Sequence, residues 1–133
     1  MKRFFWILLF VSYFSNAQDS IRVDMSNPHA TVYTHLYFLQ SDSYQPKKAA
    51  KTILGLSEKK AIEKAIKIKQ VLDGKGLFVD VNRIPVDDNY KDTIGYSSYF
   101  RYVLFPQRMP QIYVEKTGDN WYYSSETIAK IDD

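Results

Sequence analysis

Apolar residues in the first part of the chain recur with the spacing of an α-helix. The apolar stripe, at positions i, i+4 and i+7, consists of Val32, Leu36 and Leu39. This repeat places the three side chains on one helical face. Asn27 suits the capping position, and Pro28 suits the first turn because its missing N–H would be unbonded there. The pattern predicts a helix over residues 28–40.

Two more helices are predicted before the middle of the chain. Pro46 opens a short one, and Gly55 stops it. Ser57 caps the next, which a Gly-Lys-Gly sequence at residues 74–76 ends. The apolar stripe of this longer helix consists of Ala61, Ala65, Ile68 and Leu72. Polar side chains cover its other side, so it is predicted to be amphipathic.

The period of the pattern changes from 3.6 to 2 after the third helix, which indicates strands. A short strand is predicted over residues 77–81, and a polar loop over residues 82–95. The next strand contains alternating Phe100, Tyr102 and Leu104. Two further strands, marked by Ile112 and Val114 and by Trp121 and Tyr123, form a hairpin around turn residues 117–120.

The chain ends in a short predicted helix. Ser124 or Ser125 caps it, and Glu126 lies in its first turn, where the helix dipole favours a negative charge. The predicted fold class is α+β: three N-terminal helices, then a small antiparallel sheet with a C-terminal β-hairpin and a short terminal helix. Because Asp132 and Asp133 are disfavoured at a helix C-terminus, we interpret the last helix as interrupted, as in a truncated longer protein.

Residues 1–17 have the pattern of a cleavable secretory signal peptide. A basic pair precedes an apolar run over residues 4–14, and Ser15 and Ala17 supply the small residues of a cleavage site. The run is shorter than the roughly 20 residues that a membrane-spanning helix needs. We therefore expect export rather than anchoring, which places the mature chain in the periplasm.

Composition limits what the mature chain can be. After the signal, 116 of the 133 residues remain, and we divide them into an irregular lead-in (18–26) and a single α+β domain (27–133). Without the two basic residues of the signal, 16 basic residues stand against 15 acidic ones, so the net charge falls from +3 to +1. This balance gives no indication of nucleic-acid binding. The chain has no cysteine, so packing rather than disulfides must stabilise it.

Residues that commonly carry chemistry do not stand in functional patterns. His29 and His35 are the only histidines, and their spacing puts them about 120° apart around a helix, which does not suit a metal pair. No serine lies in a G-x-S-x-G motif, and the glycines at 74–76 end a helix where a phosphate loop begins one. The acidic residues between 80 and 92 break the spacing of a calcium loop. We expect no catalytic residue, no metal and no cofactor.

The third predicted helix carries a lysine-rich side, formed by Lys59, Lys60, Lys64, Lys67 and Lys69. The ordinary interpretation is a solvated helix face. The alternative is attraction to acidic lipid headgroups or cell-wall polymers.

Aromatic residues are dense on the predicted strands. Strand alternation puts some rings in the core and others outside, where they suit stacking on sugars, peptides or a protein partner. We name as a possible binding face Tyr99, Tyr102, Tyr113, Trp121, Tyr122 and Tyr123.

Five segments, in their order and spacing, carry a family resemblance. They are NPHATVYTHL (27–36), LDGKGL (72–77), YVLFP (102–106), PQIYVEK (110–116) and NWYYS (120–124). With them the mature chain resembles the extracytoplasmic N-terminal domain that precedes some MscS-type mechanosensitive ion channels of gram-negative bacteria. The resemblance implies a periplasmic domain joined to an inner-membrane channel that opens under membrane tension. No pore or gate residue carries over, because the sequence has no pore helix.

Two hypotheses of function follow. The first is a non-catalytic periplasmic module of an MscS-like channel, whose partners are the membrane-channel portion and other subunits. The second is a free-standing secreted binding module, whose exposed rings hold an envelope glycan, a peptide or a protein. A third hypothesis is a small hydrolase, but the sequence identifies no nucleophile, base and orienting acid for it.

Overall fold

The structure is a computed structural model that describes residues 21–94 and 96–133. Its helices are α2 (Pro28–Tyr37), α3 (Pro46–Ala49), α4 (Glu58–Gly74) and α5 (Ser125–Lys130). Its strands are β1 (Asp92–Ile94), β2 (Ser97–Tyr99), β3 (Arg101–Phe105), β4 (Met109–Thr117) and β5 (Asn120–Tyr123). The α+β class is confirmed, with its N-terminal helices, β4–β5 hairpin and short last helix. The predicted signal peptide and the start of the lead-in lie outside the described residues.

The helix starts form as their capping residues predict. The Asn27 side chain accepts a hydrogen bond from the Ala30 amide at 2.7 Å, and Ser124 accepts one from the Thr127 amide at 3.0 Å. Ser57 likewise caps α4. The first helix ends at Tyr37 rather than at residue 40, because the following amides bond to carbonyls three residues back and tighten the last turn.

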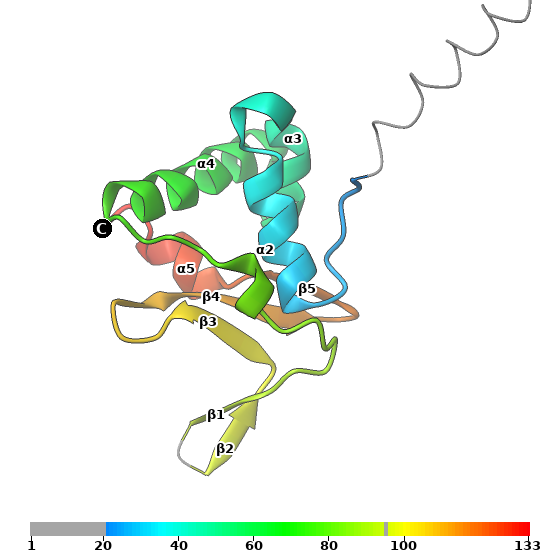
Figure 1. Cartoon of the computed structure of the whole chain (residues 1–133), viewed down its shortest axis with the longest axis vertical. Helices are drawn as coiled ribbons and strands as arrows, with labels where there is room; N and C mark the ends of the chain where they lie inside the picture. Colours follow the sequence, from blue (N-terminus) through cyan, green and yellow to red (C-terminus); the bar gives the residue numbers. More distant parts are fainter. Residues whose placement is uncertain (1–20, 95) are drawn as a thin grey trace, which may run out of the picture.

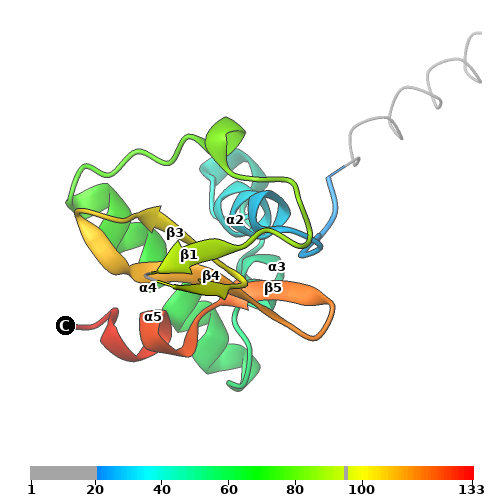
Figure 2. The same cartoon turned by 90° about the horizontal axis from the view of Figure 1, so that it is seen from below.

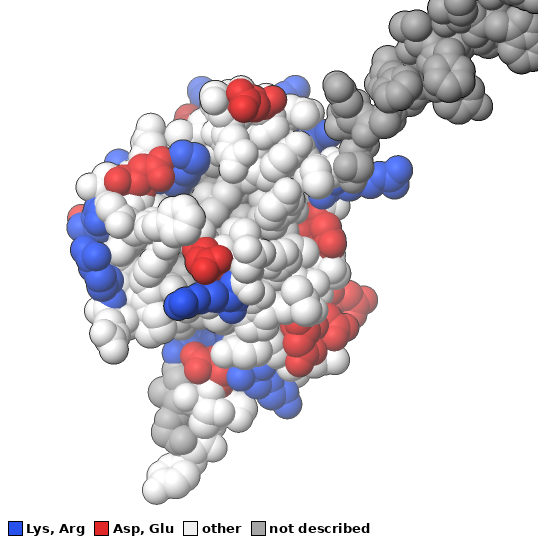
Figure 3. All heavy atoms as spheres, viewed as in Figure 1, with Lys and Arg blue, Asp and Glu red and all other residues white. Residues whose placement is uncertain are grey.

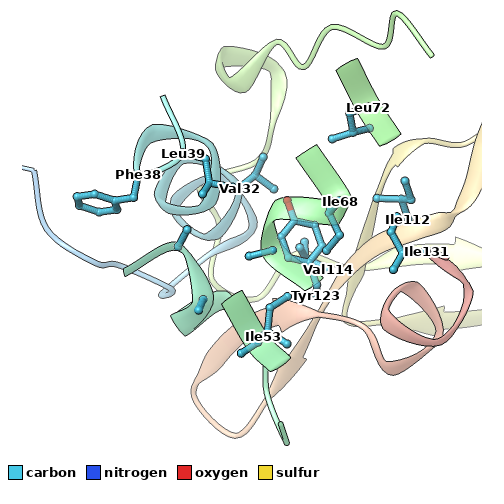
Figure 4. Packing of buried hydrophobic residues seen from close by; sticks show 14 of the residues in the cluster. Val32, Phe38, Leu39, Ile53, Ile68, Leu72, Ile112, Val114, Tyr123 and Ile131 are labelled. Carbon is cyan, nitrogen blue, oxygen red and sulfur yellow. The ribbon is translucent and has the colours of Figure 1, made fainter. Parts of the chain in front are cut away.

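The helices cover one face of a three-stranded antiparallel sheet with the order β3-β4-β5 (Figure 1). The stripe predicted for α4 is buried in full and packs toward this sheet. Figure 4 shows Ile68 of α4 beside Val114 and Tyr123 of the sheet, and Ile131 from the chain end beside Ile112. The core therefore lies between the helical layer and one face of the sheet.

Polar contacts cover two stretches along the β5 side of this sheet. The Trp121 amide of β5 donates to the Met25 carbonyl of the lead-in at 2.7 Å. Where β4 extends past β5, the Thr127 hydroxyl of α5 accepts from the Tyr113 amide at 3.1 Å and donates to the Gln111 carbonyl at 2.8 Å. The last helix thus satisfies backbone groups that would otherwise be unpaired.

Two predictions between residues 77 and 99 are wrong. Residues 77–80 belong to no strand, and a 3₁₀ turn follows at Val81–Arg83. The alternation itself is present, since Leu77 is buried and Phe78 is 84% exposed, but the segment crosses the helices and has no strand partner. The polar loop contains β1, which pairs with β2 in a separate two-stranded sheet. Figure 2 shows this hairpin in front of the larger sheet.

Candidate functional site

The predicted aromatic face is divided between the core and the surface. Trp121 is 0% exposed and Tyr123 is 2% exposed, so naming them as binding residues is wrong. In the β4–β5 register Tyr123 lies opposite Val114, on the sheet face that the helices cover. Tyr102, Tyr113 and Tyr122 are half-buried, and Tyr99 is exposed.

A buried pair of hydrogen bonds connects α2, α4 and β5 at His35, which lies in the core. His35 Nε2 lies 2.7 Å from the Ala65 carbonyl oxygen, and its Nδ1 lies 2.8 Å from the Tyr123 hydroxyl. Because a carbonyl only accepts, Nε2 carries the proton, and Nδ1 accepts from Tyr123. Burial lowers the pKa of His35 from 6.5 to about 4 and raises the pKa of Tyr123. The imidazole is therefore neutral and serves as a structural link.

Arg101 organises the aromatic residues that remain accessible. Its guanidinium lies over the ring of Tyr113 at 5.2 Å and near the ring of Tyr99 at 5.7 Å. Its Nε lies 3.3 Å from a carboxylate oxygen of Asp92 on β1. These contacts join the β1–β2 hairpin to the larger sheet. We call Tyr99, Arg101 and Tyr113 the Arg101 patch.

Tyr113 is fixed from its other end by α5. Its hydroxyl donates to Glu126 at 2.9 Å, and Lys130 donates to the other oxygen of Glu126 at 2.9 Å. These two donors lower the pKa of the Glu126 carboxyl, with Lys130 the larger cause. Burial, followed by the bond to Glu126, raises the pKa of Tyr113. The patch is thus held in place by charged groups from β1 and α5.

A shallow groove with a volume of about 390 Å³ lies between α2, α4 and the segment after α4. Tyr33 and Tyr37 of α2 stack on each other in its wall, with centroids 5.6 Å apart. Its lining also includes Phe78 and the Lys69–Asp73 ion pair, whose atoms lie 2.6 Å apart. Figure 3 shows this face as a largely uncharged, hollowed surface with charged side chains around it. We call this feature the α2–α4 groove.

Two of these features were not predicted from the sequence. Tyr99 and Tyr113 were expected in a binding face, but Arg101, the residue that brings them together, was not. The α2–α4 groove was not predicted either. Residues 77–81 were expected to form a strand, whereas Phe78 lies in a segment that has no strand partner and lines the groove. The only sequence signal was the aromatic spacing of Tyr33 and Tyr37 on one side of the first helix.

The described residues contain neither a cluster of metal ligands nor a membrane-spanning helix. Within 21–94 and 96–133, no three His, Cys, Asp or Glu side chains gather as a metal site would require. In the same ranges no helix has the length and apolarity needed to cross a bilayer. His29 lies at the start of α2, where its Nδ1 donates to the Val81 carbonyl at 2.7 Å.

Comparisons with protein-family models, with curated proteins and with solved structures give no match to this chain.

Proposed function

We propose that the chain is a non-catalytic module of the cell envelope that binds a protein partner through the Arg101 patch. The observation that carries this proposal is an arginine held between two accessible tyrosine rings. Tyr and Arg are the residue types most enriched at the energetic centres of protein interfaces. Because Asp92 and Glu126 already fix two of the side chains, binding costs less conformational entropy.

The state of His35 supports a non-catalytic role. Both ring nitrogens of His35 are used in buried hydrogen bonds, so this imidazole is not free to act as a general base. A triad-type hydrolytic mechanism would need a histidine whose free ring nitrogen lies beside a nucleophile, and His35 offers none.

Within this proposal, the partner is the membrane portion of an MscS-type channel. The support is the ordered resemblance of five segments, which form parts of α2, β3, β4, β5 and the end of α4. The domain then lies on the periplasmic side of the inner membrane, and contributes to channel assembly or to the response of the pore. The export signal, whose residues precede the described part, is consistent with that location.

A photo-crosslinking residue at Tyr99 tests the partner. In living cells we expect a covalent adduct with an envelope protein, and we expect Arg101→Ala to reduce its yield about tenfold, as a truncated interface centre does. The matched control is the same crosslinker at Val86, which is 70% exposed and lies outside the patch. Mass spectrometry of the adduct then identifies the partner.

The identity of the adduct separates the two parts of the proposal. A membrane-spanning channel protein supports both parts, and a soluble envelope protein contradicts the channel part alone. Equal yields at Tyr99 and Val86 contradict the Arg101 patch as an interface. Arg101→Ala must keep the circular dichroism spectrum of the parent chain for this comparison to count.

A second candidate function is glycan binding in the α2–α4 groove. The observation that favours it is Phe78, which is 84% exposed beside the polar groups of the Lys69–Asp73 pair. An aromatic face with polar neighbours is typical of carbohydrate recognition by stacking. On a glycan panel we expect Phe78→Ala to abolish binding and Val86→Ala to preserve it. No glycan bound by the parent chain would contradict this candidate.

A further inference from the structure

The connection between α3 and α4 carries two exposed leucines. Leu54 is 48% exposed and Leu56 is 37% exposed, whereas the preceding Ile53 is buried. Gly55 separates the two leucines with a φ of 85°, a conformation that other residues rarely adopt. The tight turn thus holds two large apolar side chains outside the core.

Lysines flank these leucines on both sides in the sequence, and Lys47 and Lys51 line the same hollow as the two leucines. Five exposed lysines, from α3, the turn after it and the first turn of α4, are Lys47, Lys48, Lys51, Lys59 and Lys60. Glu58 is the one acidic residue between positions 45 and 60, and it lies 4.0 Å from Lys47. We call the five lysines with Leu54 and Leu56 the basic corner.

Charge is segregated along the chain in a way that favours this corner. Residues 45–76 contain nine lysines and three acidic residues, whereas residues 77–133 contain six basic and nine acidic residues. The small net charge of the chain is therefore the sum of a positive helical part and a negative sheet part. An anionic surface is attracted to the first and repelled by the second, which orients the molecule.

The leucines decide which anionic partner fits. A soluble polyanion pairs with the lysines but offers no apolar surface for the exposed leucine side chains to contact. An anionic bilayer offers negative headgroups above an apolar interior, and so it matches both parts of the corner. Beside Leu54 and Leu56 lies a hollow of about 340 Å³ whose lining includes Met25 and Ala50, so apolar surface continues inward from the corner.

We propose that the basic corner docks the domain on a bilayer that contains anionic phospholipid. Leu54 and Leu56 enter the boundary between headgroups and acyl chains, while the lysine ammonium groups lie at the level of the phosphates and their stems cover apolar surface. This contact is separate from the Arg101 patch. It applies whichever protein partner that patch binds.

Sedimentation with lipid vesicles tests the proposal. The exported chain is incubated with vesicles of phosphatidylglycerol and phosphatidylcholine in equal parts, and with vesicles of phosphatidylcholine alone. We expect binding to the first and little to the second. Because each lysine near the surface contributes a factor of about five, the Lys51→Glu, Lys59→Glu double variant is expected to bind at least twentyfold more weakly.

The leucines are tested separately from the charges. Leu54→Ser with Leu56→Ser is expected to weaken vesicle binding about tenfold at unchanged net charge. The charge control compares two single variants, Lys51→Glu in the basic corner and Lys75→Glu outside it. Lys75 is exposed at the far end of α4, so Lys75→Glu should bind vesicles more tightly than Lys51→Glu. All chains share one N-terminus, so the differences report the corner.

Three results would overturn membrane docking. The first is equal binding to both vesicle types. The second is full binding by the leucine variant together with release by soluble polyphosphate, which would indicate a polyanion site. The third is an equal loss in Lys75→Glu and Lys51→Glu, which would indicate attraction by net charge alone. Circular dichroism of each variant confirms that the comparison is between folded chains.

Discussion

Replacement of Trp121 by alanine is expected to lower the free energy of unfolding by about 3–5 kcal/mol. The indole is 0% exposed, and its Nε1–H donates to the Asp88 carbonyl at 3.1 Å. Alanine leaves a cavity under the helices and an unpaired carbonyl in the loop before β1. For a domain whose whole stability is of the order of 5–15 kcal/mol, this loss is large, and the melting temperature should fall by at least about 10 °C.

The neighbouring residue supplies the control. Tyr122 is half-buried on the opposite side of β5, so Tyr122→Ala is expected to cost much less than Trp121→Ala. Denaturant unfolding of the three chains measures the difference. If Trp121→Ala kept the stability of the parent chain and lost partner binding instead, Trp121 would be a binding residue. Its burial would then contribute little to the free energy of unfolding.

Features that depend on neighbours in sequence could be predicted. Asn27 was expected to cap the first helix and does so, and of Ser124 and Ser125, the two candidates for the last helix, Ser124 is the cap. Such caps can be predicted because each bonds an amide only three residues further along. The stripe of α4 was correct for the same reason, since its period is a property of one segment. The β4–β5 hairpin follows from its turn residues, and Gly118 takes the positive φ that such a turn needs.

Features that depend on distant segments could not be predicted in the same way. The alternation after α4 separates Leu77 from Phe78 correctly, but it does not say whether another strand pairs with them. In β5 the period of 2 puts Trp121 and Tyr123 on one face. It does not say which face the helices cover, and so both were placed in the candidate site.

The candidate site itself shows the same limit. The sequence offered tyrosines at strand spacing, whereas the Arg101 patch needs contacts among β1, β2, β3, β4 and α5. Asp92 is nine residues from Arg101 in the chain, inside a stretch predicted to be a loop. An arginine between two rings is therefore a tertiary feature, and composition alone gives no indication of it.

Acidification from pH 7 to pH 4 is expected to cost about 3 kcal/mol of stability through His35 alone. Burial lowers the pKa of His35 from 6.5 to about 4 in the folded chain, while the unfolded chain keeps a value near 6.5. Between these values the unfolded state binds a proton that the folded state does not. Stability is therefore level above about pH 7 and falls by about 1.4 kcal/mol per pH unit between 6.5 and 4.

Urea unfolding at several pH values measures this slope, and His35→Gln identifies its source. The glutamine side chain has no titrating proton, so the variant is expected to be less stable overall but to show no slope between pH 6.5 and 5. The carboxyls of Glu126 and Asp132, whose pKa values are also lowered, act below that window, because their stabilisation is lost only as they are protonated. A slope that persisted in His35→Gln, or a flat profile in the parent chain, would show that His35 is not the buried neutral link between Ala65 and Tyr123.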